Sequence, residues 1–410
     1  MVKQSVLPMS GIFSSQRFGR PQLVAAALLL VFVGECAWLV AHEYPNAGGA
    51  DEFVRIEEGL AQFHGLGVAG TPAIRATPLG SVPAQNELYD PHHSPLWYLI
   101  AAAPIFVFHV SPDSVLWMWL TRGPFVLLGT LLGASLWYVS RRLYGNAGGY
   151  VALALYCSSP AVIRGSALWV AQPDVAGAWG TFGAVFTAIA VSHTLYAPRE
   201  VVLWNWRRIV LLGVSLTLAI GSQFGLAIVI PVLLAFMLYA APERKGAAIV
   251  ILAAACLIAL LLLFASYFFH PALFFQGLKH ARLFDVNWRS IAMPGAYRQV
   301  LNEMIGSGPA LLVLFPSALL IFLLWPRARY FGNTAPLLVA VLFLLQRILS
   351  PHGTGSVFSL TAVTFLFVFI SGIAADLLEA KSLESISAVF VGLVAANALW
   401  DLVGLARLGH

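Results

Sequence analysis

The sequence is poor in charged residues and in cysteine, and both shortages restrict the class of protein. Only 10% of its 410 residues are charged, whereas 60% are hydrophobic and the mean hydropathy is +0.83. This composition excludes an ordinary soluble domain, because apolar runs of about 20 residues, long enough to cross a bilayer, recur along the chain. The three cysteines, Cys36, Cys157 and Cys256, lie in apolar runs without metal-ligand spacing, so we interpret them as small buried apolar side chains.

Several binding and catalytic motifs are also absent. The sequence has no glycine-rich phosphate loop, no Ser-His-Asp pattern, no metalloprotease helix motif and no nucleotide-binding domain. It shows no internal repeat of the kind that many transporters carry. The net charge of +5 is explained by Lys and Arg residues that flank membrane spans, so we expect no nucleic-acid partner.

The apolar runs predict an all-α polytopic membrane protein with about eleven transmembrane helices, folded as one domain over residues 1–410. The run 208–241 is long for one helix and short for two. Because Gly221 to Gly225 interrupt it, we predict two short helices joined at that break. The spans are expected near 22–41, 119–140, 147–169, 175–196, 208–222, 225–241, 246–268, 308–325, 334–349, 356–376 and 386–404.

The basic residues predict the orientation of these spans. Lys3, Arg17 and Arg20 precede the first apolar run, which we interpret as a retained signal anchor in the cell (inner) membrane. With the N-terminus in the cytoplasm, more than half of the Lys and Arg residues fall at cytoplasmic ends. The prediction leaves two extracytoplasmic loops, at about 42–118 and about 270–306, and places the apolar but short stretch 95–110 in the membrane interface. Anion binding or ordinary solvation explains the basic residues of the second loop: Lys279, Arg282, Arg289 and Arg298.

Asp51 and Glu52 stand at the head of the first outer loop. Carboxylates beside hydrocarbon are costly, so the pair is a candidate catalytic site. The segment from Asp51 to Phe63 has apolar residues at helical spacing and places Arg55 on another face. Either acid could act as a general base toward a hydroxyl group, or the pair could simply favour the positive end of a helix.

Other polar residues map to the same predicted membrane level. Asp174 suits the first turn of a helix after Pro173, and it could equally share a site with Asp51. His93 follows Asp90 and His92, a group that could contact a phosphate or a metal, although solvated loop histidines are common. We assign no metal ligands, and His93 and Asp174 are the weak candidates. Whether the protein uses a divalent metal ion is an open question at this point.

Arg347 lies near the end of an apolar run, where a guanidinium needs an anionic partner. A lipid phosphate or a protein carboxylate would serve. His352 is expected at the outer end of a helix close to it. Glu35 and Arg164 are two further charges inside predicted spans, and the sequence does not decide their partners.

Four segments occur in an order and at spacings that match a known family. They are Ala50-Asp51-Glu52, His93-Ser94-Pro95-Leu96-Trp97-Tyr98, the stretch from Arg122-Gly123-Pro124 to Arg141-Arg142-Leu143-Tyr144-Gly145, and Val170-Ala171-Gln172-Pro173-Asp174. Over residues 22–240 the chain resembles the glycosyltransferase C (GT-C) superfamily, in particular bacterial relatives of protein O-mannosyltransferases and of the lipid A aminoarabinose transferase.

The resemblance implies a sugar donor linked to polyprenyl phosphate and an active site on the outer face. It carries the role of catalytic base to Asp51, beside Glu52, and that of a second acidic residue to Asp174. Gln223 stands where some relatives have Lys, and His93-Ser94 where some have an acidic-basic pair. Phosphate binding could therefore use other residues here, and the candidates are Arg55, His93, Gln223, Arg282, Arg347 and His352.

Together these observations predict a hexosyl- or pentosyltransferase that inverts the anomeric centre, with a lipid, glycan or protein as acceptor. A polytopic transporter or lipid flippase is the main alternative. A glycan polymerase or ligase that uses lipid-diphosphate donors, and a non-catalytic relative, are two others. Membrane lipid is an expected partner in every case.

Overall fold

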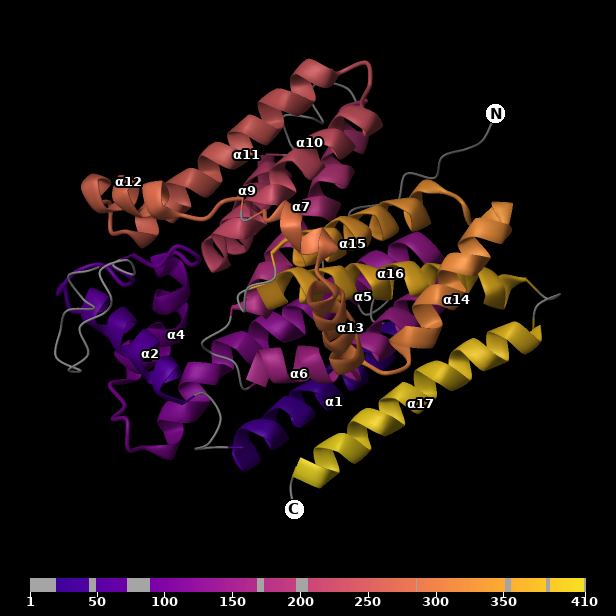
Figure 1. The fold of residues 1–410 in the computed structure, drawn as a ribbon, viewed down its shortest axis with the longest axis horizontal. Coiled ribbons are helices and arrows are strands. Elements are labelled where there is room, and N and C mark those ends of the chain that lie inside the picture. The colour runs from indigo at the N-terminus through magenta and orange to yellow at the C-terminus, as the bar shows by residue number, and fades with distance from the viewer. Residues whose placement is uncertain are drawn as a thin grey trace.

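The computed structural model describes residues 20–43, 49–71, 89–167, 173–196, 206–284, 286–350, 355–380 and 384–408. Within these ranges every regular element is a helix (Figure 1). The elements are α1 (Arg20–Glu43), α2 (Gly49–Phe63), α4 (Pro95–Phe108), α5 (Val115–Cys157), α6 (Pro160–Ala167), α7 (Asp174–Thr194), α9 (Trp206–Ser222), η1 (Phe224–Ile228), α10 (Val229–Ala240), α11 (Lys245–Ser266), α12 (Pro271–His280), η2 (Trp288–Ala292), α13 (Pro294–Ser307), α14 (Leu311–Leu324), η3 (Pro326–Ala328), α15 (Phe331–Leu349), α16 (Ser356–Glu379) and α17 (Glu384–Leu408).

Six of the described helices are long and apolar enough to cross a membrane, namely α1, α5, α7, α11, α15 and α16. The pair α13 and α14, bent by 102°, would raise the number to seven if it forms one span. These helices are typical of a multi-pass integral membrane protein. A helix lies at each of the eleven predicted positions, but α9, α10 and α14 are short, so the count of about eleven spans stays a prediction.

Element α5 is a helical hairpin. Its backbone reverses at Gly145, where φ is +75° and ψ is −170°, a conformation that glycine adopts without steric cost. The Tyr156 hydroxyl donates a hydrogen bond of 2.5 Å to the Gly129 carbonyl, 27 residues earlier, which shows that the two arms lie side by side. The break predicted between 119–140 and 147–169 is confirmed.

The second arm ends earlier than predicted. The expected helix 147–169 is interrupted after Cys157, and α6 begins at Pro160. Proline has no backbone N–H and disfavours a helical residue before it, which accounts for the break. The Ser159 hydroxyl instead donates a hydrogen bond of 2.7 Å to the Ser307 carbonyl of α13.

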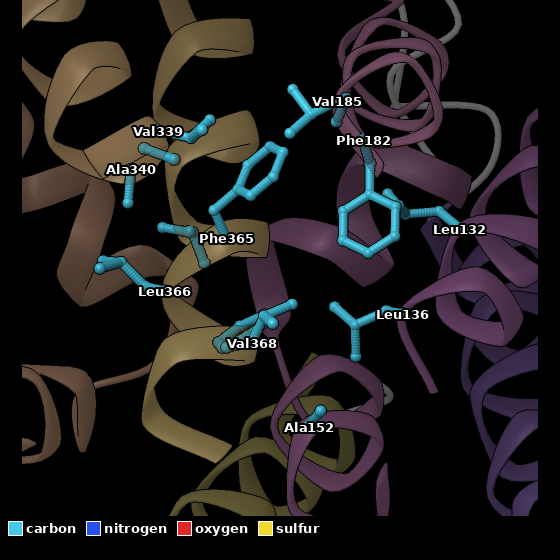
Figure 2. Close-up of a cluster of buried hydrophobic side chains, with 14 of the residues drawn as sticks. Leu132, Leu136, Ala152, Phe182, Val185, Val339, Ala340, Phe365, Leu366 and Val368 are labelled. Carbon is cyan, nitrogen blue, oxygen red and sulfur yellow. The ribbon is translucent and has the colours of Figure 1, made fainter. Parts of the chain in front are cut away.

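Helix α16 forms the centre of the bundle. All residues from Val357 to Ala375 are buried, as expected for a helix that is hydrophobic on every side. Phe365, Leu366 and Val368 of α16 point toward three neighbouring helices (Figure 2). The neighbours contribute Leu132 and Leu136 of α5, Phe182 and Val185 of α7, and Val339 and Ala340 of α15. Because α16 contacts α7 and α15 together, it fixes Asp174 at the start of one relative to Arg347 near the end of the other.

Helices α2 and α4 form a separate pair beside the bundle (Figure 1). They approach closely at Gly59, where an added Cβ would lie 2.4 Å from the Tyr98 carbonyl oxygen. Helix α4 occupies the short stretch predicted to be helical at 95–110, and its place in the membrane interface stays a prediction. The pair carries Asp51 and Arg55 on α2, and it joins the bundle where α4 contacts α5, α9 and α11. Trp97 of α4 packs against Phe125 of α5 there.

Candidate active site

The break between α9 and η1 holds the start of α4. Gln223 has an extended backbone there (φ −151°, ψ 122°) and is 4% exposed, so the break predicted at Gly221 to Gly225 is confirmed. The Gly221 carbonyl accepts hydrogen bonds from the Ser94 amide (3.1 Å) and hydroxyl (2.8 Å). The Phe224 amide donates to the His92 carbonyl at 2.7 Å. The interrupted helix therefore supplies backbone groups that position the segment from His92 to Ser94.

The second outer segment contacts the same place. The Arg282 amide donates a hydrogen bond of 2.8 Å to the Pro91 carbonyl, while the Arg282 side chain is exposed. Three residues singled out from the sequence, His93, Gln223 and Arg282, are thus brought together from three distant parts of the chain.

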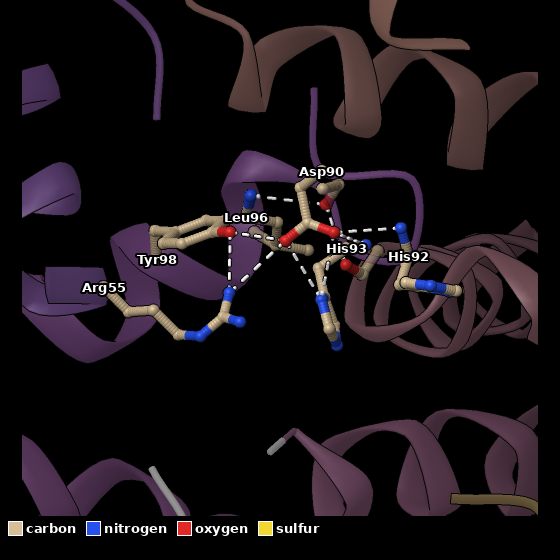
Figure 3. A network of polar contacts seen from close by, with 8 residues as sticks. Arg55, Asp90, His92, His93, Leu96 and Tyr98 are labelled. Atoms are coloured by element: carbon tan, nitrogen blue, oxygen red, sulfur yellow. Dashed lines mark hydrogen bonds and ion pairs between the residues drawn. The ribbon is translucent and has the colours of Figure 1, made fainter. Parts of the chain in front are cut away.

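Asp90 organises the polar side chains around this segment (Figure 3). Its carboxylate accepts hydrogen bonds from the amides of His92 (2.9 Å) and His93 (3.1 Å), and His93 Nδ1 lies 3.1 Å from Asp90 Oδ2. The Tyr98 hydroxyl donates to the same oxygen. Arg55 Nη1, from α2, donates to Tyr98 at 2.8 Å and to Asp90 Oδ2 at 3.3 Å. The carboxylate therefore fixes His93 and connects α2 to α4.

The charge state of this network follows from its contacts. Burial alone would raise the pKa of Asp90, but His93, Arg55 and the Tyr98 hydrogen bond together hold that pKa well below its usual value. Burial, and then Asp90, raise the pKa of Tyr98. Burial opposes the charge of Arg55, yet Tyr98 and Asp90 raise the pKa of its guanidinium. Asp90 is therefore ionised at neutral pH, Tyr98 is a proton donor and Arg55 is a cation.

A second buried group joins α13, α15 and α16. Arg347 Nε lies 2.9 Å from Glu303 Oε2, and Arg347 Nη2 lies 2.5 Å from Glu303 Oε1. Arg347 Nη1 donates to the Ser350 carbonyl at 2.7 Å, and the Ser359 hydroxyl donates to Glu303. The Arg347 side chain is 1% exposed and that of Glu303 is 24% exposed. The sequence analysis left a lipid phosphate or a protein carboxylate as the partner of Arg347, and the structure shows the carboxylate of Glu303.

Asp174 links the two groups electrostatically. Its carboxylate interacts with His93 of the first group and with Glu303 and Arg347 of the second, and Ser356 lies beside it. The residue before Ser356 must be glycine, because a Cβ added at Gly355 would lie 2.4 Å from Arg347 Nη1. Asp174 therefore makes one continuous polar site of residues from the first outer segment and from the helix ends.

The structure describes the remaining predicted site residues only in part. Asp51 and Glu52 belong to the first turns of α2, but their side chains, like all of His352, lie outside the described residues. Asp51 precedes Arg55 by four residues, so the two positions share one face of the helix.

Glu303 and Ser359 are two site residues that the sequence analysis missed. The available signal was that Glu303 is the only acidic residue between Asp285 and Asp376. A lone carboxylate at the start of an apolar stretch has the same claim to a functional role as Asp51.

The described residues do not supply a metal centre. Among them, no group of three or more His, Cys, Asp or Glu side chains is arranged to hold a metal ion. His93 and Asp174, the weak candidates, are instead engaged with Asp90 and with the charges around Glu303.

No protein-family model matches the sequence, and no curated protein matches it. The fold does match solved structures of the oligosaccharyltransferase AglB from Archaeoglobus fulgidus. Its complex with an inhibitory peptide and a dolichol-phosphate has a TM-score of 0.64 at 13% identity, covering 97% of this chain and 56% of that one. The apo form gives 0.59 at 13% identity, covering 97% and 57%. The complex with Zn and sulfate gives 0.53 at 15% identity, covering 94% and 53%.

The chain therefore shares its helical fold with part of this oligosaccharyltransferase. The similarity extends over nearly the whole of this chain but little more than half of the archaeal protein. At 13% identity it establishes the arrangement of helices and not a shared activity.

Proposed function

We propose that this protein is a membrane glycosyltransferase that moves a sugar from a polyprenyl-phosphate carrier to an acceptor on the extracytoplasmic face. The observation that carries the proposal is the continuous polar site between the first outer segment and the helix ends, within a GT-C fold. The archaeal protein of similar fold was solved with a dolichol-phosphate, a lipid of the same chemical class. The acceptor is a hydroxyl group of a lipid, glycan or protein.

The proposed location follows from the direction of the helices. Arg327 and Arg329 precede α15, whereas Arg347 lies in its last turn, so the basic residues and the polar site are at opposite ends. The positive-inside rule then puts the site outside the cytoplasm and the N-terminus inside. We propose one transmembrane domain over 1–410 in the cell (inner) membrane, with about eleven spans if the short helices α9, α10 and α14 and the apolar part of α17 cross as well.

A lipid-linked donor suits this location, because its tail partitions into the bilayer while its head group reaches the polar site. In the proposed reaction the Asp51 carboxylate takes the proton of the acceptor hydroxyl. The hydroxyl oxygen attacks the anomeric carbon with inversion, and the bond from that carbon to the phosphate oxygen breaks. The electron pair leaves with the polyprenyl phosphate, whose growing negative charge needs cations.

Arg55 and Arg282 are the proposed phosphate ligands. Arg55 Nε has no hydrogen-bond partner among the described residues, and the Arg282 side chain is exposed. Both lie against the segment that contains His93, which Asp90 orients. Arg347 is paired with Glu303, so we assign it a positioning role; Asp174 and Glu303 offer carboxylate oxygens to sugar hydroxyls.

The test uses purified protein in lipid nanodiscs with a panel of polyprenyl-phosphate sugars. The expected result is release of polyprenyl phosphate with transfer or hydrolysis of one sugar, and a loss of about 10²–10⁴-fold in Asp51→Asn. Glu57→Gln is the matched control, because Glu57 is exposed on the same helix. Normal turnover in Asp51→Asn would exclude the assigned base. Movement of intact lipid-linked sugar across vesicles without bond cleavage would favour the flippase alternative.

A further inference from the structure

A separate cavity lies between α6, α13 and α17, and none of the residues that line it belongs to the polar site of Asp90, His93, Asp174, Glu303 and Arg347. Its volume is about 220 Å³. Pro160, Ile163 and Pro309 give it apolar walls, and Arg164 and Asp401 line it with charge. Helix α17 runs along the edge of the molecule beside α6 and α1, so the cavity lies at the periphery of the bundle (Figure 1). A volume below the range of roughly 300–1,000 Å³ typical of drug-sized ligands fits a small polar group.

The charges of this cavity are not satisfied by the protein. Asp401 is only 4% exposed, and its Oδ2 atom has no hydrogen-bond partner in the described part of the chain. Glu35, on α1, does not line the cavity, but its buried Oε2 atom likewise has no partner in the described part of the chain, and it interacts electrostatically with Asp401. Arg164, which lines the cavity, attracts Asp401. A buried carboxylate without donors is costly, so a ligand that brings N–H groups to it would be favoured.

We propose that this cavity binds the head group of a phospholipid that carries both a primary ammonium and a phosphate. The ammonium donates hydrogen bonds to Asp401, and the phosphate binds Arg164. The surface beside Asp401 fits a lipid, because Leu399, Trp400 and Val403 of α17 are 65%, 62% and 49% exposed. Acyl chains would lie along these side chains while the head group enters the cavity.

Two glycines keep the cavity open. Gly306 of α13 and Gly404 of α17 both line it, and a Cβ added to either meets no atom within 4 Å. A leucine at Gly404 would therefore enter the space of the head group without a clash with the backbone. Gly392 lies on the same helix, is equally open and does not line the cavity, so it offers a control for the change in helix propensity.

The test is native mass spectrometry of the full-length protein equilibrated with vesicles of phosphatidylethanolamine, phosphatidylcholine or phosphatidylglycerol. Only the first lipid has both a primary ammonium and a phosphate, so it should be retained best. Asp401→Asn should lower its retention about tenfold, the effect of losing one charged hydrogen bond. Gly404→Leu should also lower it, because the leucine fills the space of the head group, while Gly392→Leu should not. Equal retention of the three lipids, or unchanged retention in both cavity variants, would overturn the proposal. Because lipid retention is measured without turnover, the outcome is independent of the proposed glycosyl transfer.

Discussion

Arg347 and Glu303 form a two-point ion pair across 44 residues of sequence, between the last turn of α15 and the last turns of α13. Ser359 of α16 completes the group by donating to the carboxylate. The pair connects three helices at the end of the bundle where Asp174 begins α7. It therefore determines the shape of one wall of the candidate active site.

Removing one partner of this pair should be more harmful than removing both. Glu303→Ala leaves the Arg347 guanidinium buried without its carboxylate, a change that typically costs about 3–5 kcal/mol. The double variant Glu303→Met with Arg347→Met replaces the ion pair by apolar side chains and should recover much of the loss. Thermal unfolding midpoints in detergent measure the effect. An equal loss in the single and double variants would show that the pair itself, and not the orphaned charge, sustains the fold.

Asp90 should make the folded protein less stable as the pH falls into the acid range. Its pKa in the folded protein lies well below the unfolded value of about 3.9, so folding favours the ionised form. The contribution is fully present above the unfolded pKa and is lost as the pH falls through the folded one. We expect the difference in melting temperature between the wild type and Asp90→Asn to be largest above about pH 5 and to shrink below pH 4. A difference that stays constant down to pH 3 would contradict the ionised network.

Gly145 and Gly34 should respond in opposite directions to alanine. At Gly145 the positive φ is unfavourable for any L residue, so Gly145→Ala should destabilise the hairpin of α5 by about 1–2 kcal/mol. Gly34 is helical in α1, and an added Cβ meets nothing within 4 Å. Gly34→Ala should stabilise the protein by about 0.4–1 kcal/mol. Thermal midpoints of the two variants decide whether the backbone reverses where the structure places it.

The helices were largely predictable from the sequence, because local hydropathy and glycine or proline breaks determine them. The break at Gly221 to Gly225 and the reversal at Gly145 are both local signals that the structure confirms. The break after Cys157 was missed because the apolar run continues past it. Pro160 was the local sign of a helix break, but the prediction followed the continuous hydropathy instead.

The candidate site was predictable only in part. The sequence indicated His93, Asp174 and Arg347 as residues at one membrane level, and the structure brings them into a single electrostatic group. It did not indicate Glu303, because the partner of a buried arginine is fixed by the packing of α13 against α15 and not by spacing along the chain. The role of Asp51 as general base stays a prediction, since its side chain lies outside the described residues.

Ser94 should contribute more to stability than an ordinary helix cap. Its hydroxyl accepts the Leu96 amide at the start of α4 and also donates to the Gly221 carbonyl at the break after α9. Ser114 caps α5 through the same contact with the Leu116 amide, but within the described residues its hydroxyl does not donate to a second helix, and it lies in an exposed turn. Ser114→Ala should cost about 1 kcal/mol, the usual value of an N-cap.

Ser94→Ala should cost about 2–3 kcal/mol, because it also leaves a buried carbonyl with one donor fewer. It should further lower sugar transfer, since the segment from His92 to Ser94 loses one of its anchors to the broken helix. Thermal midpoints and turnover of the two variants are measured side by side. If Ser94→Ala and Ser114→Ala are equally mild in both measurements, the Ser94 hydroxyl does not anchor the segment that contains His93.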